Sequence, residues 1–387
     1  MLRGLSALPR RVSGVRAAAL VPAAALFFAA PVGFAGPPKV DATAVFVQNG
    51  SNGEVLFRHR ERARVPIASI TKLMTVLVAL ERTSLTDLVT VPASATLAGG
   101  STINLRPGEQ LTVRDLVEAA LIQSANDAAG ALAAHVGGGS QGRFVSLMNE
   151  RARQLGLTDT RFVRPDGLDV PGHVSSARDV TRLARIAMQQ PVVRQIVRRR
   201  SDTIAGGRTL HTWNDLLASF PGVLGVKTGH TAAAGWSQVA AARGPGFTIY
   251  ATLLGGPSRS ERNEDLAGLL TWALARYRPV ALVTAGRVYA RTETAYGRAP
   301  VPLVATRPLV RVVRVDRSLR ERVIAQAFVA LPVTRGQRLG EIRIYEGSRL
   351  LGSRPLVAAR SASRPGVGGR VAWYTEEVLE RMGGWIG

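Results

Sequence analysis

Two lysines of this chain stand where side chains could carry out acyl-transfer chemistry. The 387 residues include 50 cationic ones, but only Lys39, Lys72 and Lys227 are lysines, and the other 47 are arginines. An arginine stays charged in practice, whereas a lysine amine can be tuned to a neutral, proton-accepting form. Ser69 precedes Lys72 by three residues, so on a helix both side chains project from one face. This spacing predicts a nucleophilic hydroxyl beside an amine base.

Two more short motifs follow in order along the chain. Ser124-Ala125-Asn126 lies at a predicted helix break, and Lys227-Thr228-Gly229 ends a predicted strand. Each motif alone carries little information, but the ordered set uses two of the three lysines. The chain has no cysteine, its five histidines lie far apart, and no HExxH occurs. We therefore expect neither a thiol nucleophile nor a metal or other cofactor.

The hydrophobic pattern predicts elements that position these motifs within one α+β domain, residues 40–278. Strands at both sequence ends of this region should share a sheet, with helices between them. The predicted strands are 43–48, 54–57, 224–228, 236–242 and 247–255, and the predicted helices are 69–81, 113–122, 128–136, 141–155, 177–189 and 260–277.

The C-terminal third differs in kind. Short alternating runs at 309–315, 324–330 and 341–345 predict a small all-β domain over 280–360. A Gly- and Pro-containing linker is expected over 361–370. Residues 371–387 then place on one helical face Val371, Tyr374, Val378, Met382 and Trp385 or Ile386. Trp373 and Trp385 suit the headgroup region of a membrane. This pattern favours an amphipathic helix that lies on a membrane surface over one docked on the protein itself.

The N-terminus has the layout of a secretory signal peptide. Arginines occupy residues 1–16 without an acid, an apolar run covers 17–30, and Gly33 and Ala35 are the small residues before a cleavage point. We expect residues 1–35 to be removed on export. The formal charge of +23 would suggest nucleic acid for a cytoplasmic protein. Export excludes that partner and leaves anionic lipid or acidic wall polymer.

The motifs and their surroundings resemble the type-5 low-molecular-weight penicillin-binding proteins, which are D-alanyl-D-alanine carboxypeptidases among the penicillin-recognising serine acyltransferases. The segments that carry the resemblance are PIASITKLMT, QSANDAAGALA, TRFVRPDGLD with SSARD after it, and GVKTGHTAAAGW. The resemblance extends through the β-rich region and the terminal helix. It implies a DD-peptidase/β-lactamase-like domain with an antiparallel sheet and a helical cluster, active outside the cytoplasm on the outer face of the cytoplasmic membrane.

The resemblance also implies catalytic roles. Ser69 would attack the terminal D-Ala–D-Ala bond of a peptidoglycan stem peptide, and β-lactams would acylate the same hydroxyl. Lys72 would be the general base, and the nearby ammonium of Lys227 would disfavour its charged form. Ser124 would relay a proton to the leaving amine. Asn126 would hold the substrate amide and orient the base.

Substrate-binding roles follow from the same resemblance. Lys227 and Thr228 would grip the terminal carboxylate with help from Arg262. Gly229 would leave the strand edge open for the substrate backbone. The backbone N–H of His230 and that of the nucleophile would form the oxyanion hole. The oligomeric state stays open.

Other readings of the same motifs remain. A β-lactamase needs a deacylating glutamate, and Glu150 is the only one between the second and third motifs. A DD-endopeptidase that cuts cross-links and a catalytically slow wall-binding protein are further alternatives. Asp166 stands where many relatives have His, which leaves the part of its loop in deacylation open. Asn214 would either line the cleft or cap a turn.

Overall fold

The computed structural model describes residues 36–383. The predicted leader, residues 1–35, and Trp385 of the predicted terminal helix lie outside that range. The contacts of the described chain divide it into two compact units, with the boundary between Tyr277 and Arg278. We call residues 36–277 the first unit and residues 278–383 the second unit.

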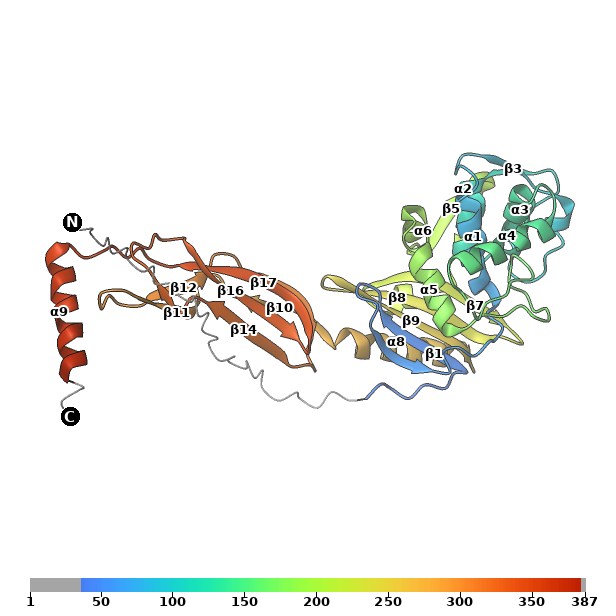
Figure 1. The fold of residues 1–387 in the computed structure, drawn as a ribbon. Coiled ribbons are helices and arrows are strands. Elements are labelled where there is room, and N and C mark those ends of the chain that lie inside the picture. Colours follow the sequence, from blue (N-terminus) through green and yellow to red (C-terminus); the bar gives the residue numbers. More distant parts are fainter. Residues whose placement is uncertain (1–35, 384–387) are drawn as a thin grey trace, which may run out of the picture. The chain divides into compact units, whose positions relative to one another are not determined.

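An antiparallel sheet of five strands, in the order β2-β1-β9-β8-β7, forms the centre of the first unit (Figure 1). Strands from both ends of the unit therefore share one sheet, and the expected α+β organisation is confirmed. The strands are β1 (Ala44–Asn49), β2 (Val55–His59), β7 (Val223–Thr231), β8 (Gly235–Gly244) and β9 (Phe247–Gly256).

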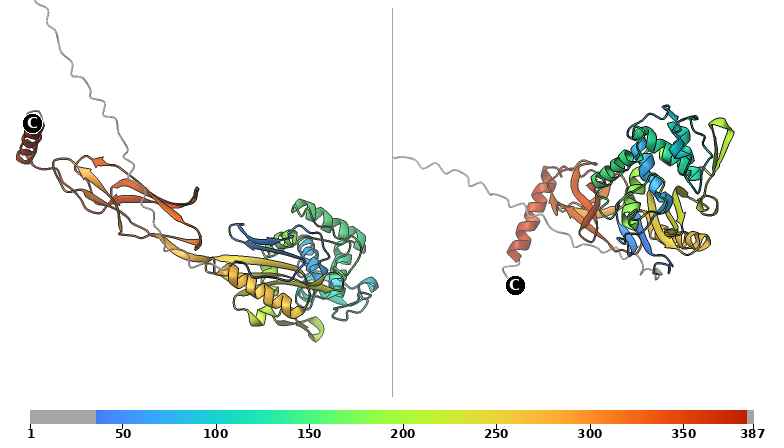
Figure 2. Two further views of the ribbon diagram at one scale, coloured as in Figure 1. Left: turned by 90° about the horizontal axis from the view of Figure 1, so that it is seen from below. Right: turned by 90° about the vertical axis from the view of Figure 1, so that its right-hand side faces the viewer.

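Helices cover both faces of this sheet (Figures 1 and 2). Helix α8 (Arg259–Leu274) packs against β8 and β9 on one face, and α5 (Ala177–Ala187) packs against β1 and β9 on the other. Strands β8 and β9 are accordingly buried along most of their length on both sides. Their sequences therefore do not alternate between apolar and polar residues, and Ser237, Gln238 and Thr252 are buried among the apolar side chains.

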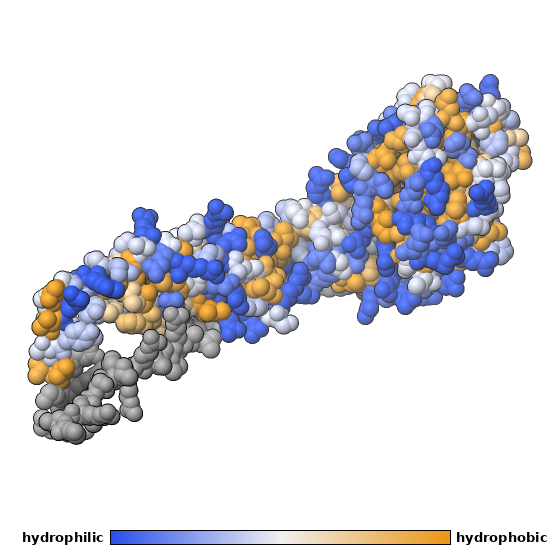
Figure 3. All heavy atoms as spheres, turned by 45° about the horizontal axis from the view of Figure 1, so that its top comes forward, coloured by the Kyte–Doolittle hydropathy of each residue, from blue (hydrophilic) through white to orange (hydrophobic). Residues whose placement is uncertain are grey.

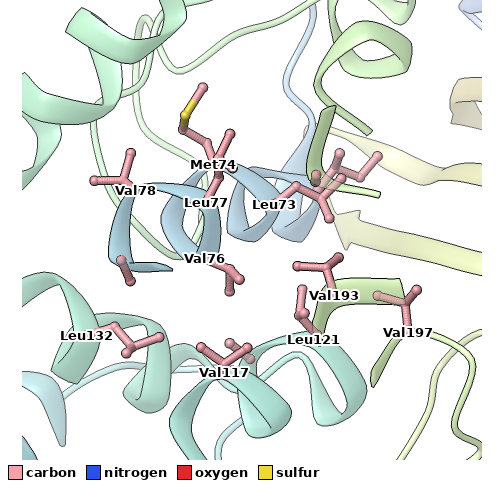
Figure 4. Close-up of a cluster of buried hydrophobic side chains, with 14 of the residues drawn as sticks. Leu73, Met74, Val76, Leu77, Val78, Val117, Leu121, Leu132, Val193 and Val197 are labelled. Atoms are coloured by element: carbon pink, nitrogen blue, oxygen red, sulfur yellow. The ribbon is translucent and has the colours of Figure 1, made fainter. Parts of the chain in front are cut away.

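The helical cluster holds the segment that carries the first motif. Helix α1 (Lys72–Leu80) is buried at all positions but the last, and Figure 4 shows its side chains among those of neighbouring helices. The partners in this core include Val117, Leu121, Leu132 and Val193. They come from α2 (Val113–Glu118), the π-helical turn Ala119–Gln123, α3 (Asn126–Val136) and α6 (Pro191–Ile196). The cluster is completed by α4 (Gln141–Gln154).

The structure differs from the predicted elements at several points. The expected helix 69–81 begins as a tight 3-10 turn over Ala68–Thr71, and the expected helix 113–122 ends in the π-helical turn. These departures coincide with the first two motifs. Short elements without a strong pattern were not predicted: β3 (Leu88–Thr90), β4 (Gln110–Thr112), β5 (Ser201–Ile204), β6 (Arg208–His211) and α7 (Leu216–Ser219).

The second unit is built around a sheet of six strands, in the order β14-β16-β17-β12-β11-β15, with a separate pair of β10 and β13. The run 324–330 predicts one strand, but the structure divides it between the end of β14 and the short β15. The strands are β10 (Tyr277–Val283), β11 (Val288–Thr294), β12 (Val301–Ala305), β13 (Leu309–Arg314), β14 (Leu319–Ala325), β15 (Phe328–Val329), β16 (Arg338–Glu346) and β17 (Arg349–Ala358).

A final helix, α9 (Val367–Gly383), begins inside the segment expected to be a linker. Ala362 of that segment bridges Val333, so the linker also contacts the strand region. Apolar α9 residues are exposed (Figure 3), namely Val367, Val371, Tyr374, Val378 and Leu379. Trp373 instead packs edge-on against Tyr296, with ring centroids 5.4 Å apart. Within residues 36–383, no helix combines the length and apolar character needed to cross a bilayer.

Candidate active site

Ser69 lies in the 3-10 turn that leads into α1 and is partly accessible at the surface of a cleft. The residue before it, Ala68, has a positive φ of 47°. This backbone turn allows the hydroxyl to leave the buried helix and reach the cleft. The Oγ of Ser69 is 2.8 Å from the Nζ of Lys72, so the predicted nucleophile and base are in hydrogen-bond contact.

Lys72 is completely buried, and each of its three contacts involves an oxygen atom. Its Nζ lies 2.8 Å from Ser69 Oγ, 2.6 Å from Asn126 Oδ1 and 2.7 Å from the backbone oxygen of Asp166. The last two oxygens can only accept hydrogen bonds. They therefore orient the two N–H groups of a neutral amine and leave its lone pair facing the Ser69 hydroxyl.

Burial lowers the pKa of Lys72 to about 7, against the opposing influence of the Asp166 carboxylate. The sequence predicts that the ammonium of Lys227 helps to lower this pKa; the causes resolved in the structure are burial and, more weakly, the charge of Arg164. Burial also lowers the pKa of Lys227, followed by the charges of Lys72 and Arg262. The two lysines thus lie in one poorly solvated region in which protonation of one disfavours protonation of the other.

Lys227, on β7, reaches the second motif. Its Nζ donates to Ser124 Oγ at 2.9 Å and to the backbone oxygen of Thr228 at 3.0 Å. Ser124 follows the π-helical turn with left-handed φ and ψ of 64° and 30°. The three motifs, separated by up to 158 residues in sequence, therefore meet at two hydrogen-bonded hydroxyl–amine pairs. Asn126 links them to the chain around Gly99, whose carbonyl accepts from Asn126 Nδ2 at 2.6 Å.

Two glycines allow other segments to pack against the Ser69 turn. A Cβ on Gly167 would lie 2.0 Å from the backbone oxygen of Ala68, and the φ of Gly167 is +86°. A Cβ on Gly229 would lie 2.7 Å from the backbone oxygen of Ile67. Gly229 lines the cleft, as predicted, and it also meets a packing constraint that the sequence did not indicate. Its missing side chain makes room for the turn that carries Ser69.

The loop containing Asp166 contacts α1 through backbone carbonyls. The Asp166 carbonyl accepts from Lys72, and the Pro165 carbonyl accepts from Thr75 Oγ1 at 2.6 Å. The Asp166 carboxylate is directed instead to Arg164, whose Nη2 donates at 2.7 Å, and to the Leu168 N–H. Burial opposes ionisation of Asp166, but these donors hold its pKa below the ordinary value. Asp166 therefore supplies a carbonyl to the base rather than a carboxylate to the cleft.

His173 supports the same loop from below. It is buried, burial lowers its pKa to about 4, and it is therefore neutral at physiological pH. Its Nδ1 accepts from the Val163 N–H at 3.0 Å. The remaining ring nitrogen, Nε2, then carries the proton and donates to Thr71 Oγ1 at 2.7 Å. His173 fixes the loop against the residue next to Lys72.

Arg262, at the start of α8, lines the cleft although its side chain is only 1% exposed. Burial lowers its pKa to about 10, so it remains charged at neutral pH. Its guanidinium donates to Asn263 Oδ1 at 2.6 Å and approaches Asp215 at 3.5 Å. A buried cation with so little acid around it suits a carboxylate ligand.

The cleft has a volume of about 280 Å³. Seven of the nine predicted site residues line it directly, while the two lysines lie beneath its surface. Six further lining residues were not predicted: Gly100, Ser101, Leu168, Trp213, Trp236 and Arg259. No acidic residue is among those lining the cleft. Within residues 36–383, no group of three or more potential metal ligands occurs.

Comparison with known proteins agrees with this geometry. The profile of the D-alanyl-D-alanine carboxypeptidase family matches residues 32–258. The chain belongs to this family. The D-alanyl-D-alanine carboxypeptidase DacC of Escherichia coli is 31% identical over 94% of this chain and 95% of that protein. DacF of Bacillus subtilis is 28% identical over 84% and 86% of the two chains. This chain is accordingly a hydrolase of the serine peptidase type.

Solved structures of the carboxypeptidase family extend the match through both units. Penicillin binding protein 5 of Haemophilus influenzae has a TM-score of 0.63 and 27% identity, covering 85% of this chain and 99% of that one. Penicillin binding protein 6B of Escherichia coli has a TM-score of 0.63 at 29% identity, with the same coverage. The predicted DD-peptidase fold with an all-β C-terminal region is therefore confirmed.

The structure shows where three further residues lie: Asn214 and Glu150, whose roles the sequence left open, and His230. Asn214 is buried beside the cleft rather than in its lining, and its Oδ1 accepts from Gln238 Nε2 at 2.8 Å. Glu150 is exposed on α4 and accepts from Gln154, away from the cleft. His230 is exposed at the cleft, and its ring stacks on Trp236 with centroids 3.9 Å apart.

Proposed function

We propose that this carboxypeptidase removes the terminal D-alanine from peptidoglycan stem pentapeptides through an acyl-enzyme on Ser69. The observation that carries the proposal is the 2.8 Å contact between Ser69 Oγ and the buried amine of Lys72. Neutral Lys72 takes the hydroxyl proton while Ser69 Oγ bonds to the carbonyl carbon of the penultimate residue. The N–H groups of Ser69 and His230, both cleft residues, stabilise the oxyanion.

Collapse of the tetrahedral intermediate breaks the peptide bond and releases D-alanine. Ser124, hydrogen-bonded to Lys227, relays the proton that Lys72 took up to the leaving amine, which returns Lys72 to its neutral form. Thr228, Lys227 and Arg262 hold the terminal carboxylate at this end of the cleft. Water then attacks the ester on Ser69, with Lys72 again as base. A β-lactam, whose ring amide and carboxylate mimic the substrate, acylates the same hydroxyl.

The cleft argues against efficient β-lactam hydrolysis. A β-lactamase of this motif class deacylates with a glutamate, and no acidic side chain is among the residues lining this cleft. Glu150, the one candidate in the sequence, is exposed on α4. Slow release of the penicilloyl group follows from this proposal.

The site is tested by incubating the chain from Gly36 to Gly387 with a pentapeptide muropeptide and, in parallel, with a cross-linked dimer. D-alanine release from the pentapeptide alone supports the carboxypeptidase. Cleavage of the dimer alone changes the assignment to endopeptidase. Penicillin labelling of Ser69 without turnover of either substrate identifies a slow, wall-binding protein, and Ser69→Ala is the blank for all three readouts.

We further propose that the enzyme is exported and lies on the outer face of the cytoplasmic membrane, with α9 in the headgroup region. The support is the row of exposed apolar residues that includes Val371, Tyr374 and Val378. Co-sedimentation with phosphatidylglycerol vesicles tests this placement. Replacing these three residues with Ser should abolish sedimentation, whereas Thr375→Ser on the same helix should retain it. Equal sedimentation of both variants contradicts the proposal.

A further inference from the structure

Trp213 is a wall residue of the cleft that the family motifs do not include. It lies between β6 and α7 and lines the cleft together with Ser124, Thr228 and Arg262. The residue is 45% exposed. A large ring left partly in water gives up part of the stabilisation that its burial would supply. Its position at the cleft therefore calls for an explanation from ligand contact.

The ring is held in one orientation by contacts to its edge and to its face. Its Nε1 donates to the backbone oxygen of Gln123 at 3.0 Å, and the same oxygen accepts from Ser101 Oγ at 2.8 Å. The guanidinium carbon of Arg259 lies 5.5 Å from the centre of the ring. A cation at this distance is attracted to the ring face.

Arg259 is itself fixed by a network at the start of α8. Its Nε and Nη2 donate to the two carboxylate oxygens of Asp215 at 2.8 and 2.6 Å. Asn263 Nδ2 donates to the same carboxylate at 2.8 Å, and Arg262 approaches it at 3.5 Å. The Trp213 ring is thus part of a wall whose residues are held together by hydrogen bonds, an ion pair and a cation–ring contact. This wall lies at the end of the cleft where Arg262 lies.

A second aromatic wall stands beside Arg262. Its guanidinium carbon is 5.8 Å from the centre of the Trp236 ring, on which His230 stacks. Arg259 and Arg262 are three residues apart on α8, so they project from one face of this helix. Each cation therefore lies over one tryptophan ring, and both rings line the cleft.

The cleft that these walls border is small. The whole cleft, at about 280 Å³, falls below the roughly 300–1,000 Å³ that is usual for ligand pockets. The site has to take the bond under attack, the terminal carboxylate and the side chain of the leaving residue. A ring that its neighbours hold in place should leave less room for a large leaving-group side chain than for a methyl group.

We infer that Trp213, locked by Gln123 and Arg259, determines specificity by limiting the leaving group to a small, free D-amino acid. The inference rests on the proposed function and explains why a carboxypeptidase would reject cross-links. In a cross-link the leaving amine belongs to a second stem peptide, which cannot fit against the ring. Trp213 acts on the choice of leaving group and takes no part in proton transfer.

The test compares three substrates with the purified enzyme: a stem pentapeptide ending in D-Ala, the same peptide ending in D-Phe, and a cross-linked dimer. The enzyme should prefer D-Ala strongly. Trp213→Ala should lower kcat/KM for D-Ala by roughly threefold, through lost packing, and raise kcat/KM for D-Phe by about tenfold. Its ratio of D-Ala to D-Phe release should therefore fall by about thirtyfold.

Two control variants separate leaving-group selection from a general disturbance. Trp213→Phe keeps a smaller ring without the N–H donor that binds Gln123, and its preference should lie between those of the unmodified enzyme and Trp213→Ala. Leu97→Ala removes an apolar side chain that is 85% exposed and is not among the cleft residues, so it should change neither rate. An equal loss of both rates in Trp213→Ala would overturn the inference, as would release of D-Phe or cleavage of the dimer by the unmodified enzyme as fast as release of D-Ala.

Single-turnover acylation keeps the inference separate from the proposed function. Ester analogues with D-lactate or D-phenyllactate as the leaving group acylate Ser69: its Oγ forms the new ester, the old C–O bond breaks, and the hydroxy acid leaves with the serine proton. Mass spectrometry of the acyl-enzyme gives both rates. A missing release of D-Ala refutes the proposed function, whereas equal acylation by the two esters in the unmodified enzyme refutes the role of Trp213.

Discussion

The two units differ in how many charged side chains they bury. The first unit buries two lysines, two arginines and several acids, among them Lys72, Lys227 and Arg262. In the second unit, among the described residues, the buried polar side chains are Thr292, Thr294 and Glu321. Both units have continuous apolar cores and many arginines. The difference therefore reflects chemistry rather than composition.

This contrast indicates that the first unit loses folding free energy by burying charged groups that its function needs. Removing an ammonium from water is costly unless hydrogen bonds compensate. The first unit compensates with three oxygens around Lys72 and two around Lys227. No arginine of the second unit is among the buried residues that the structure describes, and Arg311, Arg320 and Arg354 bond to backbone carbonyls.

Removal of the Ser69 hydroxyl should have the largest effect. Ser69→Ala should lower D-alanine release by roughly 10⁴-fold or more and abolish covalent labelling by penicillin, because no nucleophile remains beside Lys72. Ser101→Ala removes another cleft hydroxyl and should retain labelling. Gel fluorography with a labelled penicillin reads out both variants. Labelled Ser69→Ala would show that the nucleophile lies elsewhere.

The next largest effect should be a pH dependence of kcat/KM that reflects the buried amine of Lys72. Because burial lowers the pKa of Lys72 to about 7, kcat/KM should fall about tenfold per pH unit below that value, as the amine takes up a proton. Lys72→Arg, charged at every accessible pH, should be inactive throughout. A profile without a limb near 7 would show that the amine which titrates in this range is not the base.

The same burial has a consequence for folding. Between about pH 7 and the ordinary lysine value, the unfolded chain binds the proton that folded Lys72 lacks. The free energy of unfolding should therefore rise with pH across this window. Urea unfolding at pH 7 and 9 measures the rise, which should be smaller in Lys72→Met. An unchanged rise in that variant would assign it to Lys227 and other groups.

Close packing beneath the nucleophile gives a smaller effect that is confined to the first unit. Gly167→Ala should destabilise this unit by about 2 kcal/mol or more, since its Cβ would meet the Ala68 carbonyl at 2.0 Å. Gly172→Ala is the matched control: its φ is +81°, but the nearest atoms are those of Arg161 at 3.8 Å. It should cost only about 1 kcal/mol. Equal losses in thermal unfolding would show that backbone strain, not the clash, dominates.

Glu321, a buried charged residue of the second unit, should show the opposite dependence of stability on pH. Burial raises the pKa of Glu321, and its buried Oε2 has no hydrogen-bond partner among the described residues. Stability from this group is present at low pH and is lost as pH rises through the raised value. Glu321→Gln should therefore stabilise the protein by about 0.5 kcal/mol at pH 8, with D-alanine release unchanged.

Glu341→Gln provides the control for that comparison. The Glu341 carboxylate accepts from Arg343 at 3.0 Å, and this hydrogen bond lowers its pKa. Its removal should reduce stability at pH 8, again without effect on turnover. Denaturant unfolding of both variants measures the two signs. Stabilisation by both substitutions would mean that acidic side chains in general, and not an unpaired buried one, weaken this unit.

The predictable part of the active site consists of residues whose type is unusual in this chain. Lys72 and Lys227 stand out because lysine is almost absent, and the spacing to Ser69 follows from helical geometry. Trp213 and Arg259 could not be found in this way. One arginine among 47 carries no signal, and the position of Trp213 depends on Gln123, 90 residues earlier in the chain.

The predictable part of the fold likewise follows periodicity. The central strands and the longer helices have clear apolar patterns, and the structure contains them. The 3-10 turn at Ser69 and the π-helical turn before Ser124 have helical composition, so composition could not reveal them. The run 324–330 alternates as one strand, but the chain leaves β14 at Ala325 and pairs Phe328 and Val329 with β11. Partner choice of this kind depends on tertiary contacts that a local pattern does not contain.

Because the chain has only three lysines, chemical modification of its lysines can report local opening of the site. In the folded chain Lys39 is exposed, whereas Lys72 and Lys227 are 0% and 2% exposed. An amine-selective reagent should therefore modify Lys39 at once and the other two only when the site transiently opens. Peptide mass mapping over time would report opening at two defined atoms without any engineered label. A penicilloyl group on Ser69 should slow the modification of Lys72 and Lys227, since it occupies the cleft from which the reagent has to reach them.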